Sequence, residues 1–494
     1  MIKTRFAPSP TGYLHIGGLR TAMYSYLFAV KNNGKFVLRI EDTDRERYVE
    51  DGIQNILKSL FWAGIIPNEG VQMKESGEIY QTGDCGGSYI QSERLNIYKK
   101  HVDELLEKGH AYYCFCTSER LDEVRQFQQL NKLPTGYDKH CRDLTPEEVK
   151  KRLAAGEKYV VRMKMPLEGE TVFNDVVKGE VRIKNELVDD QIILKSDGYP
   201  TYHLAVVVDD HYMGITHIIR GDEWISSVPK HVNLYKMFGW EVPVMAHLPL
   251  LLNSDKSKLS KRQGDVSVED YRKKGYLPEA VLNFVVFLGW NPGTEQEIFS
   301  LEELVKEFSL EKIGKSGAVF NLEKLDWFNS QYIRALNGEE LVERTKPFLL
   351  ESKLMTEKEI KAKEDWLIKA LSLEKERVNT LAQLAESIGF LLKTPKYEKE
   401  LLVWKKGSME EVRAVLPELK EFLNNLSVQS YNAKNLQEKV GEWVTLKGHS
   451  NGSVLWPMRV ALSGLEKSPP PFEIAEVLGK EETIDRIDAA LKKI

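Results

Sequence analysis

A turn of small residues near the start of the chain places a histidine where chemistry on phosphate groups is expected. Residues 9–18 have the sequence Ser-Pro-Thr-Gly-Tyr-Leu-His-Ile-Gly-Gly and lie between a predicted strand and a predicted helix. Backbone amides at such a helix start bind anions, and Gly17 and Gly18 let a ligand approach the backbone closely. His15 can donate to a phosphate oxygen, although a histidine that only caps its own turn explains the same pattern.

A second segment combines cations with a flexible glycine. Residues 256–264 have the sequence Lys-Ser-Lys-Leu-Ser-Lys-Arg-Gln-Gly, in which Lys258 and Lys261 flank a short spacer and Gly264 allows the loop to move. A cationic loop that closes on a polyphosphate stabilises the charge that develops during phosphoryl transfer. A solvated run of charges is the alternative interpretation.

The elements that must position these segments are those of an α/β sheet. Residues 3–7 predict a short buried strand, residues 19–30 a helix with apolar side chains at the helical period, and residues 36–40 a second strand followed by an acidic stretch. A strand, a glycine-containing turn, a helix and a strand make the βαβ unit of a doubly wound parallel sheet. In such a sheet the histidine turn lies at the carboxyl end of the first strand.

In the rest of the chain, the predicted secondary structure changes from mixed strands and helices to helices alone. Further strands are predicted at residues 158–165, 191–194, 202–209 and 215–220, and the pattern is helical after residue 251, with helices at 302–308, 338–350, 357–371, 408–426 and 435–446 and a last helix pair after Pro469. Residues 96–195 are interpreted as an insertion between two halves of the sheet. We expect segments 1–95, 96–195, 196–250, 251–337 and 338–494, the last divided near residue 393, and no repeat or low-complexity tract is found.

Composition narrows the class of protein. At about 100–200 residues per domain, 494 residues make about three or four domains. A hydrophobic fraction of 42% excludes wholesale disorder, and a net charge of -5 excludes a protein that coats nucleic acid by bulk charge. Four cysteines make no disulfide framework, and neither the N-terminus nor the longest apolar stretch, residues 280–290, suits secretion or a membrane span. We therefore expect a cytoplasmic protein that has no membrane-spanning segment.

Together, the two loops identify a family. The His-Ile-Gly-Gly turn and the Lys-Leu-Ser-Lys-Arg loop resemble the HIGH and KMSKS signatures of class I aminoacyl-tRNA synthetases, each with a variation in its letters. Further motifs resemble the glutamyl-tRNA synthetase branch, at residues 5–12, 39–44, 208–211, 289–292 and 455–464. The resemblance covers essentially the whole chain. It implies a Rossmann-type catalytic domain with an acceptor-binding insertion, followed by all-helical C-terminal anticodon-binding domains.

The resemblance also implies the reaction and its partners. The family attaches glutamate to tRNA(Glu) through glutamyl-adenylate, using ATP with Mg²⁺ and releasing AMP and pyrophosphate. Neither step forms a covalent bond to the enzyme, so positioning and charge stabilisation must supply the rate. We expect a monomer whose partners are L-glutamate, ATP and tRNA(Glu), with tRNA(Gln) as a second tRNA substrate.

The family's site residues are carried over by motif. Those implied for ATP and catalysis are His15, Gly17, Gly18, Glu223, Lys258 and Lys261, of which His15, Lys258 and Lys261 are the catalytic ones. Those implied for glutamate are Arg5, Ala7, Ser9, Glu41, Tyr202 and Arg220. The two arginines match the family's γ-carboxylate contacts, because a guanidinium suits a carboxylate in fixed geometry. A structural salt bridge at each arginine is the alternative.

Three cysteines resemble a zinc knuckle of the acceptor-binding insertion. Cys114, Cys116 and Cys141 supply three thiols for a tetrahedral zinc site. Many members carry histidine where this chain has Asp143, and Tyr137 matches a Tyr-x-x-x-Cys ending in a shorter zinc-binding relative. We choose Tyr137 as the fourth ligand, with Asp143 and His140 as alternatives. Three reduced thiols without metal are the other interpretation, and Cys85 lies outside the spacing.

One position concerns the choice of tRNA. In strictly glutamate-specific members, an arginine on a helix of the C-terminal region contacts an anticodon base edge. An alignment by eye places Gly389 at that position. A glycine cannot make the contact, so we expect an enzyme that also charges tRNA(Gln), unless the alignment is shifted and another cation makes the contact.

Four other functions share part of this pattern. Glutaminyl-tRNA synthetase shares the catalytic half but carries β-barrel anticodon domains, and a truncated paralogue that glutamylates a tRNA base lacks the helical half. A small-molecule nucleotidylyltransferase does not need that helical half either. A non-enzymatic RNA-binding scaffold is expected to lose His15 or Lys261, and both are present.

Overall fold

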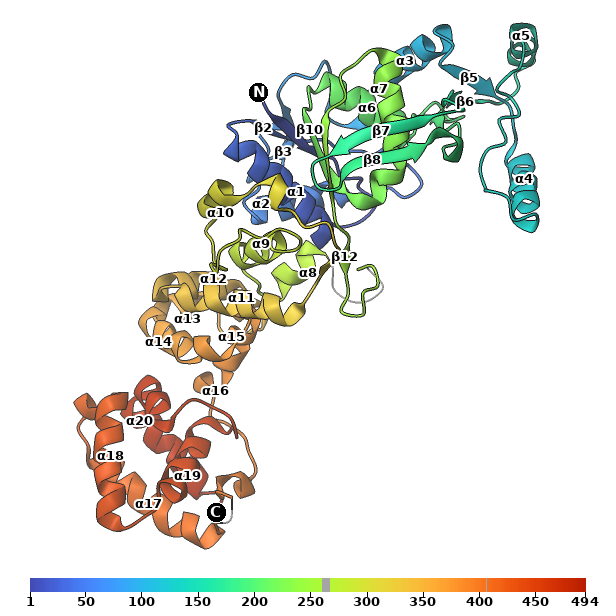
Figure 1. Cartoon of the computed structure of the whole chain (residues 1–494). Coiled ribbons are helices and arrows are strands. Elements are labelled where there is room, and N and C mark those ends of the chain that lie inside the picture. Colours follow the sequence, from blue (N-terminus) through green and yellow to red (C-terminus); the bar gives the residue numbers. More distant parts are fainter. Residues whose placement is uncertain (260–266, 406) are drawn as a thin grey trace. The chain divides into compact units, whose positions relative to one another are not determined.

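The computed structural model describes residues 1–259, 267–405 and 407–494 (Figure 1). The chain divides into two compact units, which are described separately below. Unit 1 comprises Met1–Tyr271 and Val281–Leu322, and unit 2 comprises Arg272–Ala280 and Glu323–Ile494. The predicted catalytic residue Lys261 lies outside the described residues.

The described strands all belong to unit 1. They are β1 (Lys3–Phe6), β2 (Lys35–Leu38), β3 (Glu69–Met73), β4 (Ile79–Thr82), β5 (Ala111–Cys114), β6 (Val160–Met163), β7 (Glu170–Asp175), β8 (Gly179–Lys184), β9 (Ile192–Leu194), β10 (His217–Gly221), β11 (Val244–Leu248), β12 (Leu251–Leu252) and β13 (Ala318–Val319).

Two four-stranded sheets lie side by side in unit 1. One has the order β1-β2-β3-β4 and the other β10-β11-β7-β8, and in each the first three strands are parallel while the last is antiparallel. The amide of Thr216 donates to the carbonyl of Lys3 at 2.9 Å, which places the start of β10 beside the start of β1. The predicted doubly wound parallel sheet is confirmed, and the carboxyl ends of β1 and β10 meet at one edge.

Helices cover these sheets. Those that begin in unit 1 are α1 (Ile16–Lys31), α2 (Gly52–Trp62), α3 (Leu95–Glu107), α4 (Ser118–Leu130), α5 (Pro146–Ala154), α6 (Tyr202–Tyr212), α7 (Val228–Phe238), α8 (Val268–Lys273), α10 (Leu301–Glu307) and α11 (Leu322–Ala335). Helix α1 forms where predicted because Leu19, Met23 and Leu27 recur at the helical period and are fully buried against β1, β2 and β10. It ends before Asn33, whose φ of 51° leaves the helical region.

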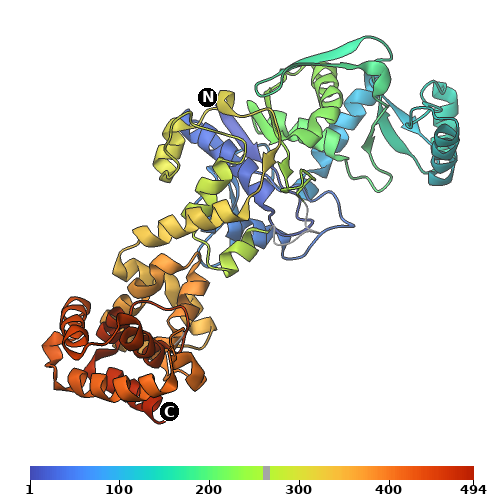
Figure 2. The ribbon, with the colours of Figure 1, turned by 60° about the horizontal axis from the view of Figure 1, so that its bottom comes forward.

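The segment expected to be an insertion makes two kinds of sheet. Strands β5, β6 and β9 form a small antiparallel sheet of their own. Strand β7 instead pairs in parallel with β11, through Asp175 and Met245, and β8 folds back on β7 (Figure 2). Part of residues 96–195 therefore extends the main sheet.

Two elements of unit 1 differ from the prediction. Residues 202–209 were expected to form a strand but form helix α6, in which every residue from Leu204 to Asp210 is buried. A helix buried on all sides has no polar face, so its apolar run has the appearance of a buried strand. The pattern past residue 251 is also not wholly helical, since β12 pairs in parallel with β13.

Unit 2 is helical throughout its described residues, as expected. Its remaining helices are α9 (Pro278–Val286, which continues into unit 1), α12 (Gly338–Glu351), α13 (Glu357–Ala362), α14 (Glu364–Glu374), α15 (Leu381–Ser387), α16 (Gly389–Leu392), α17 (Met409–Asn425), α18 (Ala433–Lys447), α19 (Asn451–Ser463) and α20 (Pro471–Leu491). The helix predicted at 357–371 is interrupted at Lys363, and α20 is two helices joined at Gly479, where φ is 76°.

Within the described part of the chain, no helix has the length and apolar character that crossing a bilayer requires.

Candidate functional site

A cavity of about 1130 Å³ lies at the carboxyl ends of β1 and β10. Its lining includes these predicted residues: Arg5, Ala7, Ser9, His15, Gly17, Gly18, Glu41, Tyr202, Arg220, Glu223 and Lys258. Every predicted glutamate or ATP residue that the structure describes is therefore at one cavity in unit 1. This is the location expected of a ligand site in an open α/β sheet.

His15 both caps helix α1 and faces the cavity. The amide of Gly17 donates to His15 Nδ1 at 2.9 Å, so this nitrogen accepts and the ring carries its proton on Nε2. A Cβ at Gly17 would lie 3.2 Å from His15 Nδ1, and one at Gly18 would lie 2.9 Å from Leu14 Cδ1. Both glycines therefore permit this tight turn. The capping role and the phosphate-binding role are compatible in one ring, so the sequence alternatives do not exclude each other.

A short hairpin brings Lys258 to the same cavity. The amide of Leu259 donates to the carbonyl of Leu251 at 2.9 Å. The amide of Asn253 donates to the carbonyl of Ser257 at 2.8 Å. Lys258 lies on the returning arm, opposite Leu252. The cation is thus held by strand pairing rather than by a loop alone.

Arg5 and Glu41 lie in a buried network of charges. Arg5 Nε donates to Asp210 Oδ1 at 3.2 Å, and Arg39 donates through Nη1 to the same oxygen at 2.7 Å and through Nη2 to Glu41 Oε1 at 3.0 Å. Burial opposes ionisation of Asp210, but the two arginines outweigh it and hold the pKa of this carboxyl below its usual range. Burial raises the pKa of Glu41, against the pull of Arg39. Arg5 therefore does form the structural salt bridge that was the alternative interpretation, and it also lines the cavity.

Arg220 is held differently, by uncharged groups. Its Nη1 donates to the Tyr202 hydroxyl at 3.0 Å, its Nε to His247 Nε2 at 3.1 Å, and its Nη2 lies 3.2 Å from His231 Nδ1. The Tyr202 ring packs on Trp224 with 4.2 Å between ring centroids. These contacts fix the guanidinium at the cavity edge.

Four residues that hold the two arginines in place were not predicted as site residues from the sequence. Asp210 and Arg39 belong to motifs that supported the family resemblance. The two adjacent acids Asp209 and Asp210, which directly follow an apolar run, could have indicated a buried ion network. His231 and His247 gave no such signal, because isolated histidines in helix and strand segments are ordinary core residues.

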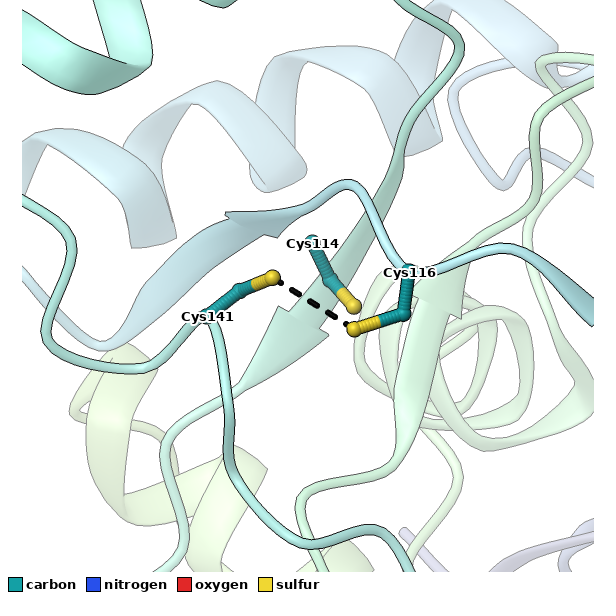
Figure 3. A group of neighbouring side chains, drawn as sticks. All are labelled: Cys114, Cys116 and Cys141. Atoms are coloured by element: carbon teal, nitrogen blue, oxygen red, sulfur yellow. Dashed lines mark hydrogen bonds between the residues drawn. The ribbon is translucent and has the colours of Figure 1, made fainter. Parts of the chain in front are cut away.

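The three cysteines predicted to bind metal come together at the end of β5. Their sulfur atoms lie within 4.8 Å of one another, and Figure 3 shows Cys116 and Cys141 joined by a 3.5 Å contact beside Cys114. Tyr137 Oη lies 3.3 Å from Cys114 Sγ and 3.7 Å from Cys116 Sγ, and it accepts from the Cys141 amide at 2.9 Å. The Tyr137 hydroxyl therefore lies beside the sulfurs of Cys114 and Cys116.

The alternatives for the fourth ligand are placed elsewhere. Among the residues that the structure describes, the group of neighbouring histidine, cysteine and acidic donors at this point contains the three cysteines and neither His140 nor Asp143. Cys85 is also apart, with its thiol donating to the carbonyl of Gly87 at 3.1 Å.

The hydrogen bond between Cys114 and Cys141 favours a thiolate at Cys114 and raises the pKa of the Cys141 thiol. Arg120 Nη1 lies 3.5 Å from Cys116 Sγ, and the Arg162 guanidinium lies 3.8 Å from the centroid of the Tyr137 ring. A hydrogen bond from Cys141, followed by one from Tyr137, lowers the pKa of the Cys114 thiol. Burial raises the pKa of Tyr137, an effect that a bound dication reverses. Three sulfurs and one oxygen in this arrangement fit a tetrahedral zinc ion.

Family models match nearly all of the chain. Residues 1–327 match the catalytic domain of "tRNA synthetases class I (E and Q)", and residues 340–491 match an anticodon binding domain.

Individual relatives are similar over their whole length. The chain is 48% identical to a glutamate--tRNA ligase of Finegoldia magna, covering 100% of this chain and 99% of that protein. It is 47% identical to the ligase of Alkaliphilus metalliredigens, covering 98% of each. A crystal structure of a glutamate tRNA ligase from Elizabethkingia meningosepticum, in complex with its amino acid, superposes with a TM-score of 0.86 at 37% identity over 99% of both chains.

Proposed function

We propose a two-step reaction for this chain from the premise that it belongs to the glutamate--tRNA ligases, a family of class I aminoacyl-tRNA synthetases. Members of this family charge glutamate onto tRNA, and this chain is such an enzyme. The observation that carries the proposal is a single cavity whose lining includes Arg5, Arg220, the His15 turn and Lys258. Such a cavity brings an amino acid and ATP together.

In the first step the α-carboxylate of glutamate attacks the α-phosphate of ATP. An oxygen of the carboxylate bonds to phosphorus, the bond to pyrophosphate breaks, and glutamyl-adenylate forms. Arg5 and Arg220 bind the γ-carboxylate with the Tyr202 hydroxyl beside them, while Glu41 and Ser9 face the α-ammonium group. His15, Gly17 and Gly18 bind phosphate oxygens, and Lys258 and Lys261 stabilise the departing pyrophosphate. The magnesium that accompanies ATP neutralises phosphate charge.

In the second step the terminal ribose hydroxyl of the tRNA attacks the glutamyl carbonyl and AMP leaves. The segments 1–95 and 196–250, together with β7 and β8, supply the catalytic sheet, and the rest of residues 96–195 bind the acceptor end. Residues 251–337 carry the cationic loop and contact the tRNA stem, and residues 338–494, divided near 393, bind the anticodon. The match of residues 340–491 to an anticodon binding domain supports the last assignment.

Pyrophosphate exchange tests this proposal. We expect exchange with glutamate and not with glutamine, and only when tRNA(Glu) is present, because acceptor binding completes the pockets by induced fit. Exchange driven by glutamine would contradict the substrate assignment. Robust exchange without tRNA would contradict the induced-fit step.

A structural zinc ion is part of the same proposal. Cys114, Cys116, Cys141 and Tyr137 would hold it, with the sulfurs as thiolates. When bound, the metal ties the end of β5 to the loop that carries Tyr137 and Cys141, and so stabilises the fold of the insertion. It supplies no chemistry to the glutamate cavity, whose lining contains none of these four residues.

The tRNA choice centres on Gly389 at the start of α16. A Cβ built at this glycine meets only Leu354 Cδ2, at 3.8 Å, so a side chain can be added without a clash. We expect the wild-type enzyme to charge tRNA(Gln) as well as tRNA(Glu), because glycine offers no contact to an anticodon base.

Introducing an arginine tests this position directly. Gly389→Arg should lower the charging of tRNA(Gln) about tenfold to a hundredfold, since one bidentate base contact is worth about 1–3 kcal/mol. Gly441→Arg is the matched control, because a Cβ at Gly441 in α18 meets nothing within 4 Å, so this side chain too can be added without a clash. Wild-type charging of tRNA(Gln) at less than about a thousandth of the tRNA(Glu) efficiency, roughly 4 kcal/mol, would refute dual specificity.

A further inference from the structure

The two arginines of the glutamate pocket differ in what balances their charge. Arg5 forms an ion pair with Asp210, at 3.2 Å, and both side chains are buried. Arg220 is also buried, 5% exposed, but among the residues that the structure describes no carboxylate forms an ion pair with it. Its partners are a phenol hydroxyl and two imidazole nitrogens. Within the described part of the chain, Arg220 is therefore a buried cation that forms no ion pair with a carboxylate.

The geometry fixes both imidazoles in a neutral form. A guanidinium only donates, so His247 Nε2 and His231 Nδ1 must both accept from Arg220. Each ring then carries its proton on the other nitrogen. That nitrogen lies 2.6 Å from Asp175 Oδ2 in His247 and 3.1 Å from His203 Nδ1 in His231.

Burial keeps these rings uncharged. His231 and His247 are 2% and 0% exposed, and burial followed by the charge of Arg220 holds the pKa of His231 well below its usual range. Burial likewise lowers the pKa of His247, and burial followed by Lys230 and Arg220 lowers the pKa of His203 to about 4. The carboxylate of Asp175 contacts Nδ1 of His247, the nitrogen that does not accept from Arg220.

We propose that His231, oriented by His203, and His247, oriented by Asp175, are positioning residues that leave Arg220 an unbalanced cation and thereby make the pocket select a ligand carboxylate over a carboxamide. A buried charge without a counter-ion is costly, and a ligand carboxylate removes that cost while an amide does not. An anionic partner at either histidine would compensate Arg220 in advance and weaken this selection. The inference deepens the proposed function and rests on it.

An isosteric pair of substitutions separates charge from shape. The side-chain oxygen of asparagine lies near the position of Nδ1, so His231→Asn keeps a neutral acceptor for Arg220, whereas His231→Asp places an anion there. In tRNA-dependent pyrophosphate exchange, we expect H231N to keep the KM for glutamate within about threefold of wild type. H231D should raise that KM at least about tenfold and lower the glutamate-to-glutamine preference by a similar factor, with the KM for ATP unchanged.

Controls distinguish this effect from misfolding. His211→Asn changes a histidine of α6, the helix that carries His203. The His211 ring stacks on Trp240 instead, so this variant should leave both KM values unchanged. Thermal unfolding of each variant reports its fold. If H231D does not fold, His203→Asp against His203→Asn asks the same question one group further out, with an expected change of about threefold.

The outcomes are distinct. Equal KM values for glutamate in H231D and H231N would overturn the inference, as would a rise of the ATP and glutamate KM values together. A wild-type enzyme without glutamate-dependent exchange would instead overturn the proposed function itself.

Discussion

Unit 1 and unit 2 bury different kinds of side chain. The buried ionised groups of unit 1 include Arg39, Glu41, Arg94, Asp209 and Asp210, which form one connected network. Among the described residues of unit 2, the buried charged side chains are Glu374 and Arg486, and the rest of the interior is mostly aliphatic.

This difference follows from what each unit must do. Replacing a buried ion pair with apolar side chains of similar size is often neutral or stabilising, so such pairs are weak evidence of stability and better evidence of function. In unit 1 the network lies against the cavity and holds Arg5 and Glu41 in place. Residues 340–491 of unit 2 match an anticodon binding domain, and a domain that binds RNA at its surface needs its interior only for packing.

The largest expected effect comes from breaking the network of unit 1. Arg39→Met should destabilise unit 1 by about 3–5 kcal/mol, because it leaves Glu41 and part of Asp210 buried without a partner. Urea unfolding followed by circular dichroism measures the loss. Arg182→Met removes exposed ion pairs with Glu180 and Glu170 in the same unit and should change the free energy of unfolding far less. Equal costs for the two variants would mean that the buried network is no more important than a surface pair.

A second variant separates chemistry from RNA binding. Lys261→Ala should slow adenylate formation about 10²–10³-fold, since removing one donor to charge developed in the transition state costs about that much. Binding of tRNA, measured by filter retention, should change little because most of that contact is assigned to other parts of the chain. An unchanged exchange rate would refute the role given to this lysine.

Metal removal tests the proposed zinc ion, which would stabilise unit 1, since all four cysteines of the chain lie there. About one zinc ion per chain should copurify, and chelation should destabilise unit 1 by about 2.7 kcal/mol when free zinc was a hundredfold above its Kd. Cys116→Ala should lose the metal, and Cys85→Ala should keep it. Wild-type protein that contains almost no zinc would favour three free thiols.

The smallest effect is expected in unit 2. Burial raises the pKa of Glu374 to about 7, although Arg377 lies 3.5 Å away. The folded state therefore holds this proton more tightly than the unfolded state, so the stabilisation is complete below pH 4.5 and is lost as the pH rises through 7. Glu374→Gln should remove this slope and stabilise unit 2 by about 1 kcal/mol at pH 8. Parallel stability profiles for variant and wild type between pH 5 and 8, about the range of the titration, would contradict the assignment.

The sequence predicted which residues line the cavity better than it predicted what holds them. Arg5 and Arg220 end strands of a parallel sheet, and His15 follows a strand in a glycine turn, so local pattern and family motif suffice to place them. Their partners come from distant segments: Asp210 is 205 residues from Arg5. No spacing rule joins such residues, because only the folded sheet brings them together.

Helix α6 shows the same limit at the level of secondary structure. It carries Asp209 and Asp210 into the core, and the burial of every residue from Leu204 to Asp210 removes the polar face by which a helix is recognised. His231 lies in an ordinary amphipathic context in α7, and its contact with Arg220 depends on how α7 packs beside β10. Packing of this kind is a tertiary property, which periodicity does not contain.

The neighbourhood of β1 and β10 has a consequence during synthesis. Lys3 bonds to Thr216, which lies 213 residues further along the chain. At about 5–20 residues per second, roughly 10–40 s pass between the emergence of the two strands from the ribosome. During that interval one edge of β1 has no neighbour. Lys3 and Arg5 place positive charges on this short strand, and edge charges discourage pairing with other nascent chains. The cations of β1 thus protect the polypeptide before the cavity that Arg5 serves exists.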